Sequence, residues 1–170
     1  GQPVKASDFV FAWNRAASPE LAGDYNYMFD VVVGYADMWE SKDSGEVDQE
    51  GNPIPEYIHP DAKLAVEAPD DKTLVVTINN KVTYWNELLA FPTYYPVRED
   101  VVADESWATK PETYVSNGAY KLTGWEHNSV ITMTKNENYF DAAAVTMPEI
   151  KFYLSDDANN MLTNFKNGSW

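Results

Sequence analysis

Cysteine is absent from the 170 residues of this chain. A disulfide, a thiolate metal site and a cysteine nucleophile are therefore excluded. Basic residues are also scarce, because 12 Lys and Arg stand against 27 Asp and Glu and give a formal net charge of −15 at pH 7. Nucleic acid and anionic lipid surfaces are bound by clustered cations, so this composition disfavours both as partners.

Long apolar runs are missing as well. No stretch of about 18 apolar residues occurs, so the sequence encodes no membrane span. No signal peptide or lipidation site precedes Gly1, and the chain stops at Trp170, directly after an expected helix end. We therefore expect a piece of a longer protein, whose only membrane attachment is an anchor outside this piece.

Catalytic signatures are few. The two histidines, His59 and His127, both stand in expected turns. None of the spacings typical of zinc proteases, serine hydrolases or phosphate-binding loops occurs. We therefore expect that the protein is not an enzyme and that it binds no cofactor. A glycoside hydrolase is the alternative from another class of protein, because acids and aromatic residues together line sugar clefts.

The residues that are present predict a globular, mixed α/β (α+β) fold, since 44% are hydrophobic and 14% aromatic. Apolar residues at helical spacing predict three helices. The first follows a cap at Ser7 or Asp8 and ends at Ser18-Pro19, and the second is a short helix within 82–90, capped near Thr83. The third follows a cap at Ser155, with Met161 and Phe165 expected in the core.

Period-two alternation predicts strands. One hairpin pairs 64–68 with 74–78 and places Pro69 and Asp70 at the centre of a type I turn. A second hairpin within 120–134 turns at 127–129, and 150–154 forms a further strand. Prolines favour an extended segment over 91–97.

The stretch 34–72 is acidic, with eleven Asp or Glu against three Lys, a local charge of 3 − 11 = −8. Its centre, 43–55, is rich in Gly and Pro and predicts an exposed loop. A calcium loop starting at Asp48 is disfavoured, because Pro53 occupies the glycine position and His59 the position of the bidentate glutamate. We therefore interpret this stretch as a surface insertion and assign no metal site.

Three phrases carry a family resemblance. Ser116–Leu122 (SNGAYKL) opens the second hairpin and Lys135–Phe140 (KNENYF) follows it, while Pro3–Trp13 (PVKASDFVFAW) stands at the start of the chain. Together they resemble the extracytoplasmic oligopeptide-binding proteins of ABC transporters, solute-binding protein family 5. Phe140 departs from the pattern, since the family usually has Trp at that position.

The resemblance implies a fragment of a two-lobed, periplasmic-binding-protein-like fold. Residues 1–96 would form most of the smaller lobe, and residues 97–170 a section of the large lobe after a crossover near Pro96. Gly118 would provide a tight backbone near the hinge. In the family a tyrosine at the spacing of Tyr25 lies on the ligand cleft, so Tyr25 is the ligand-binding candidate. Tyr27 is the second candidate, with core packing as its competing role.

The resemblance also implies partners and a location. An oligopeptide ligand and the permease subunits of an ABC transporter are expected, in the periplasm or on a lipid anchor at a Gram-positive cell surface. A metal complex or a sugar is the alternative ligand within the family. The isolated piece would bind peptides weakly or not at all, and strand edges left open in it would favour self-association.

Overall fold

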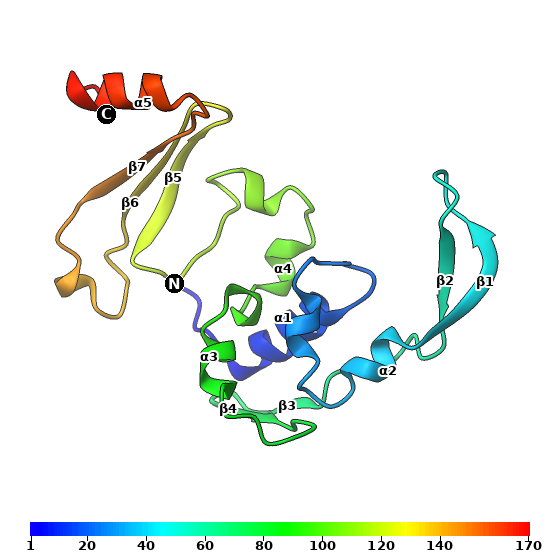
Figure 1. Cartoon of the computed structure of the whole chain (residues 1–170). Coiled ribbons are helices and arrows are strands. Elements are labelled where there is room, and N and C mark those ends of the chain that lie inside the picture. The colour runs from blue at the N-terminus through cyan, green and yellow to red at the C-terminus, as the bar shows by residue number, and fades with distance from the viewer. The chain divides into compact units, whose positions relative to one another are not determined.

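A computed structural model describes all residues, 1–170, and confirms the mixed helix and strand composition (Figure 1). The chain forms two compact units, Gln2–Glu99 and Asp100–Trp170, with Gly1 grouped with the latter. None of the helices combines the length and the apolar character that crossing a membrane requires.

Helix α1 (Ala6–Ala17) opens the first unit. The predicted cap at Ser7 or Asp8 is wrong, because the N-cap residue is Lys5, two to three residues earlier. Asp8 lies inside the first turn, where its carboxylate accepts a hydrogen bond from the Lys5 backbone N–H at 2.7 Å. The acid therefore satisfies a free donor of the helix start from within the helix.

Strands β3 (Val66–Asp70) and β4 (Thr73–Val76) form the predicted antiparallel hairpin. The predicted inward face is confirmed: Leu64 and Val66 are buried, and the alternate residues of β4 point outward. The turn differs from the prediction, because Asp70 pairs with Thr73 and so Asp71 and Lys72 are the central residues. The Asp70 carboxylate accepts from the backbone N–H groups of Lys72 and Thr73, a side-chain turn that shifts the centre past Pro69.

The core of this unit lies where α1 packs on that hairpin and on two short turns, η1 (Asn26–Phe29) and η2 (Pro92–Tyr94). Four rings meet there, those of Trp13, Phe29, Trp85 and Tyr94. Its buried members are Ala12, Trp13, Ala17, Phe29, Val32, Met38, Leu64, Val66 and Tyr94.

After helix α2 (Tyr35–Trp39), the acidic insertion forms a hairpin, β1 (Ser41–Val47) with β2 (Pro53–Tyr57), which extends away from α1 and α2 in Figure 1. The predicted exposure is confirmed, but the segment forms a regular hairpin and not an irregular loop. The Asp48 carboxylate organises the tip by accepting from the backbone N–H groups of Glu50 and Asn52 at 2.8 and 2.9 Å. The Asn52 side-chain amide, which donates to the same carboxylate at 3.0 Å, and then these backbone bonds keep the pKa of Asp48 below its usual value.

The end of the first unit differs from the prediction in the length of its helix and in the turn that follows it. Helix α3 (Trp85–Leu89) is shorter than 82–90 and begins after Tyr84, without a cap from Thr83. The segment 91–97 is not extended throughout, because η2 turns within it. The backbone N–H of Tyr94 bonds the Phe91 carbonyl, and Pro92 stands at the turn's first position, where no N–H is needed.

The second unit contains a three-stranded antiparallel sheet in the order β5-β6-β7. β5 (Tyr120–Glu126) and β6 (Val130–Lys135) confirm the predicted hairpin, whose turn places Asn128 in the left-handed region at φ 62°. β7 (Glu149–Tyr153) is the predicted further strand. The short elements of this part of the chain are α4 (Glu99–Val102), η3 (Trp107–Thr109) and η4 (Ala142–Ala144).

The SNGAYKL phrase gains its order from Asn136, the only buried polar residue. The Asn136 side-chain amide donates to the Gly118 carbonyl at 2.8 Å, and its backbone N–H donates to Ala119. Gly118 does not adopt a positive φ. The structure therefore shows a long-range hydrogen bond at Gly118 and no conformation reserved for glycine, and its role near a hinge stays a prediction.

Helix α5 (Ala158–Lys166) follows β7. Asp157, and not the predicted Ser155, is its N-cap residue, because the Asp157 carboxylate accepts from the backbone N–H groups of Asn159 and Asn160. The prediction that Met161 and Phe165 are core residues is wrong for this structure, in which they are 38% and 74% exposed. Helical spacing identified their common face but not what covers it.

Candidate functional site

The loop 23–30 carries both predicted ligand-binding residues. It is built around η1, whose Asn26 side chain donates to the Gly23 carbonyl at 2.6 Å and accepts from the Tyr35 hydroxyl. Phe29 enters the core at the end of this turn, with no measurable exposure. Tyr25 and Tyr27, which precede it, are each 52% exposed, so core packing, the competing role of Tyr27, is not what this structure shows.

Three rings form a group, which we call the aromatic cluster: the half-exposed Tyr25 and Tyr27 and the partly buried Phe91. The ring centroids of Tyr25 and Tyr27 are 6.2 Å apart, and those of Tyr25 and Phe91 are 5.3 Å apart at an interplanar angle of 61°. Edge-to-face and tilted pairs at these distances attract one another beyond simple area burial. The cluster is thus an aromatic surface that carries two phenol groups.

Beneath the cluster, Tyr94 connects the loop to the core. Its hydroxyl donates to the Met28 carbonyl at 2.5 Å, and its own carbonyl accepts from the Trp13 indole N–H at 2.8 Å. The Tyr94 side chain is buried against Phe29, with ring centroids 4.5 Å apart. Burial, and secondarily the nearby Asp30 carboxylate, raise the pKa of Tyr94, so its hydroxyl remains protonated and remains a donor.

Tyr35 is held in a similar way. Burial and then the Asp30 charge raise the pKa of Tyr35, whose hydroxyl bonds Asn26. Two phenols from outside the loop therefore hold it by hydrogen bonds, one at Asn26 and one at Met28. The loop geometry is set by tertiary contacts more than by its single turn of helix.

Sequence reasoning identified Tyr25 and Tyr27 but missed Phe91 and Tyr94 as their neighbours. Phe91 is 66 positions beyond Tyr25, and no spacing rule connects residues so far apart. The one available signal is the aromatic FPTYY run at 91–95, whose prolines favour an extended connection.

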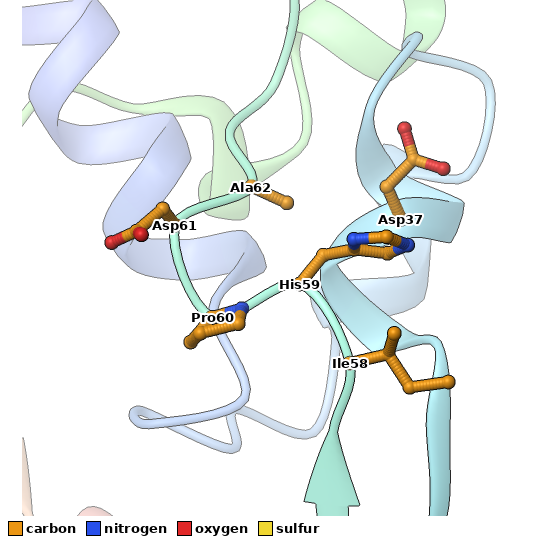
Figure 2. Close-up of a pocket in the computed structure, with 6 residues that line it drawn as sticks. All are labelled: Asp37, Ile58, His59, Pro60, Asp61 and Ala62. Carbon is orange, nitrogen blue, oxygen red and sulfur yellow. The ribbon is translucent and has the colours of Figure 1, made fainter.

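Two other hollows lie in the first unit. Figure 2 shows an open depression of about 480 Å³ lined by Asp37, Ile58, His59, Pro60, Asp61 and Ala62. His59 lies 3.2 Å from the Glu40 carboxylate through its Nε2 atom, and no group of three His, Asp or Glu side chains there or elsewhere is arranged to hold a metal ion. The second, of about 500 Å³, is apolar and is lined by Phe9, Trp13, Leu74, Val76, Trp85, Leu89 and Tyr94.

The other histidine is engaged in the second unit. His127 stacks on Trp125 with ring centroids 4.6 Å apart, and its Nε2 atom lies 3.2 Å from the Thr109 carbonyl. Neither histidine is hydrogen-bonded to a hydroxyl that could serve as a nucleophile, which is the geometry that acyl transfer requires.

The chain belongs to the bacterial extracellular solute-binding proteins, family 5, since the family model for the middle region matches residues 1–170. This is a family of substrate-binding receptors, and the resemblance inferred from the three phrases is confirmed. The oligopeptide-binding protein OppA of Bacillus subtilis is 34% identical over 170 residues, which cover 99% of this chain and 28% of that protein.

Solved structures agree on the fold. OppA of Listeria monocytogenes bound to peptide superposes with a TM-score of 0.80 at 30% identity, over 99% of this chain and 31% of that one. OppA of Haemophilus influenzae in complex with the peptide RPPGFSPFR gives 0.80 at 29% identity, over 99% and 30%. The predicted periplasmic-binding-protein-like fold is confirmed, and the chain spans less than a third of the length of these relatives.

Proposed function

We propose that this chain is a central section of an extracytoplasmic receptor that binds oligopeptides between two lobes and delivers them to an ABC importer. The names of the relatives supply the ligand class, and the aromatic cluster is the observation in this structure that supports it. Half-exposed rings held rigidly give contact area at little entropic cost and without sequence selectivity. A receptor for many different peptides needs that combination.

Within this proposal, residues 1–96 contribute most of the smaller lobe and residues 97–170 a section of the large lobe. The two compact units, which divide after Glu99, support that assignment. Tyr25 and, secondarily, Tyr27 contact the ligand. Closure of two lobes about a hinge would then bury the peptide against these rings.

The proposal extends to location and partners. The receptor works in the periplasm or on a lipid anchor at a Gram-positive cell surface, and it docks on permease subunits. It catalyses no reaction, and the relatives do not favour a glycoside hydrolase or a receptor for a metal complex or a sugar. In isolation the piece self-associates through β5 or β7, the edge strands of its sheet, which sedimentation at several concentrations tests.

Calorimetry on the complete receptor tests the ligand contact, with RPPGFSPFR and trialanine as probes. We expect Tyr25→Ala to weaken binding about tenfold, because it removes a rigid aromatic contact. Tyr25→Phe is the matched control and should retain most of the affinity, since it keeps the ring. The melting temperature of both variants should stay near that of the unaltered receptor, because Tyr25 is half exposed.

Two results would contradict the proposal. One is an unaltered receptor that binds neither probe. The other is a Tyr25→Ala variant that unfolds without any specific loss of affinity, which would make Tyr25 a packing residue. Tight, stoichiometric binding of a tripeptide by the isolated 170 residues would contradict the assignment of a partial site.

A further inference from the structure

The loop 23–30 has little internal support for a segment that presents ligand contacts. Its own backbone bonds are those of one short turn, such as Met28 N–H to the Tyr25 carbonyl at 3.1 Å and Asp30 N–H to the Tyr27 carbonyl at 3.0 Å. A single turn of this kind is weak by itself, because it orders several residues for few bonds. The position of Tyr25 must therefore come from elsewhere in the unit.

Part of that support comes from Tyr35, which bonds Asn26, and part from the segment 91–95, far along the chain. Phe91 packs its ring against Tyr25, and the Tyr94 hydroxyl bonds the Met28 carbonyl. The Tyr94 hydroxyl therefore connects the core to the loop at Met28, which is three residues beyond Tyr25.

The anchor is rigid on its core side. Tyr94 is 1% exposed, its ring lies edge-on to Trp13 and Trp85 at centroid distances of 4.9 and 6.1 Å, and its carbonyl accepts from Trp13. Contacts from two elements, α1 and α3, thus define where the hydroxyl points. A buried ring held in this way transmits position, because packed side chains have few alternative rotamers.

We propose that Tyr94 is a positioning residue for the ligand contact made by Tyr25, acting through its hydroxyl bond to the Met28 carbonyl. The inference rests on the proposed function, in that Tyr25 must contact the ligand for its position to matter. The Tyr94 side chain is 1% exposed, so we assign it a positioning role and no ligand contact.

The test is Tyr94→Phe in the complete receptor, which keeps the ring and removes only the hydroxyl. We expect the affinity for RPPGFSPFR and trialanine to fall about fivefold, the equivalent of one hydrogen bond. Amide exchange at Met28 and Asp30 should accelerate, because their turn loses its anchor. Tyr95→Phe is the matched control: the Tyr95 hydroxyl donates to the Ala90 carbonyl at 3.0 Å, in the same segment, and makes no bond to the loop. It should change neither quantity.

A double-mutant cycle with Tyr25→Ala separates positioning from general destabilisation. If Tyr94 acts through Tyr25, Tyr94→Phe has no further effect on affinity once Tyr25 is alanine. An equal loss in both backgrounds, or unchanged exchange at Met28 and Asp30, overturns the positioning role.

A Tyr25→Ala variant with full affinity contradicts the proposed ligand contact and, with it, the role of Tyr94 in binding. Faster loop exchange in Tyr94→Phe would still show in that case that the anchor exists. The two failures are thus distinguishable.

Discussion

The two units differ sharply in how they bury apolar side chains. All the buried apolar residues but Val102 lie in Gln2–Glu99, where four aromatic rings meet in one core. Both units expose large apolar side chains, but in Asp100–Trp170 almost none is buried, and Phe140 and Phe165 are 91% and 74% exposed. The first unit is thus specified by its own packing, while the second relies on the hydrogen-bond ladder of β5, β6 and β7.

The proposed ligand contacts, Tyr25 and Tyr27, lie in the unit with the dense core, where Tyr94 bonds their loop at Met28. Exposed apolar residues on α5 and around Phe140 are instead typical of surfaces that another segment or partner covers. Paired substitutions, one at a residue with many contacts and one at a matched control, measure how much the two differ in their effect on stability.

The largest effect should come from Trp13→Ala compared with Phe165→Ala. Trp13 is 2% exposed, and its removal should lower the free energy of unfolding of the first unit by about 3–5 kcal/mol. Phe165→Ala should change stability by at most about 0.5 kcal/mol, as is typical of exposed positions. Residue-resolved amide exchange measures both units separately. Equal losses would show that the face of α5 is covered in solution.

The next effect concerns Gly34, which caps α2 at φ 94°. A Cβ atom there would lie 2.2 Å from the Lys63 carbonyl oxygen, whereas at Gly45, with φ 79°, it would meet nothing within 4 Å. Gly45→Ala should therefore cost only the left-handed conformation, about 1–2 kcal/mol. Gly34→Ala should cost clearly more, because the backbone of 63–64 must also move.

Urea unfolding of the two variants measures the difference. If Gly34→Ala were no more destabilising than Gly45→Ala, the contact between Gly34 and Lys63 would not exist in solution. The two glycines, one before α2 and one in the hairpin β1–β2, would then differ in nothing but their place in the chain.

How far the sequence predicted this architecture depends on the range of the interaction. The inward face of 64–78 and the β5–β6 hairpin were predictable, because strand periodicity is local and the turns stand next to it. The starts of α1 and α5 were predicted at the wrong residues, since Asp8 and Asp157 both act through carboxylate geometry that composition does not specify. In each case the sequence shows an acid near the helix start. It does not show whether that acid is the N-cap residue or lies inside the first turn.

The candidate site shows the same limit more strongly. Tyr25 and Tyr27 were proposed from a family spacing, which says nothing of what holds them. Phe91 and Tyr94 reach the loop only through the tertiary fold. Met161 and Phe165 were wrongly predicted as core residues. An apolar helix face indicates that the face packs against something, but it does not identify the segment that packs there.

A smaller effect should follow from Asn136→Ala in the second unit. Asn136 is 5% exposed and bonds the Gly118 carbonyl, while its side-chain oxygen accepts from the Asn138 backbone N–H at 3.1 Å. Removing the amide leaves a partly buried carbonyl without its donor, which costs about 1–3 kcal/mol. Asn138→Ala keeps its backbone donor and should be nearly neutral. Thermal unfolding of the pair compares them, and similar melting temperatures would show that the SNGAYKL phrase is ordered without Asn136.

The smallest effect should come from the cap of α5. Asp157→Ala removes the acceptor for the backbone N–H groups of Asn159 and Asn160 and should cost about 1 kcal/mol of helix stability. Asp156→Ala carries the same charge change one residue earlier, where no capping bond is made, and should cost less. Because the apolar face of α5 is largely exposed, the lost cap should appear as fraying of that helix alone, read by amide exchange at Asn159–Met161. Unchanged exchange there would mean that packing, and not the cap, holds α5, and the second unit would then resemble the first more closely than its burial indicates.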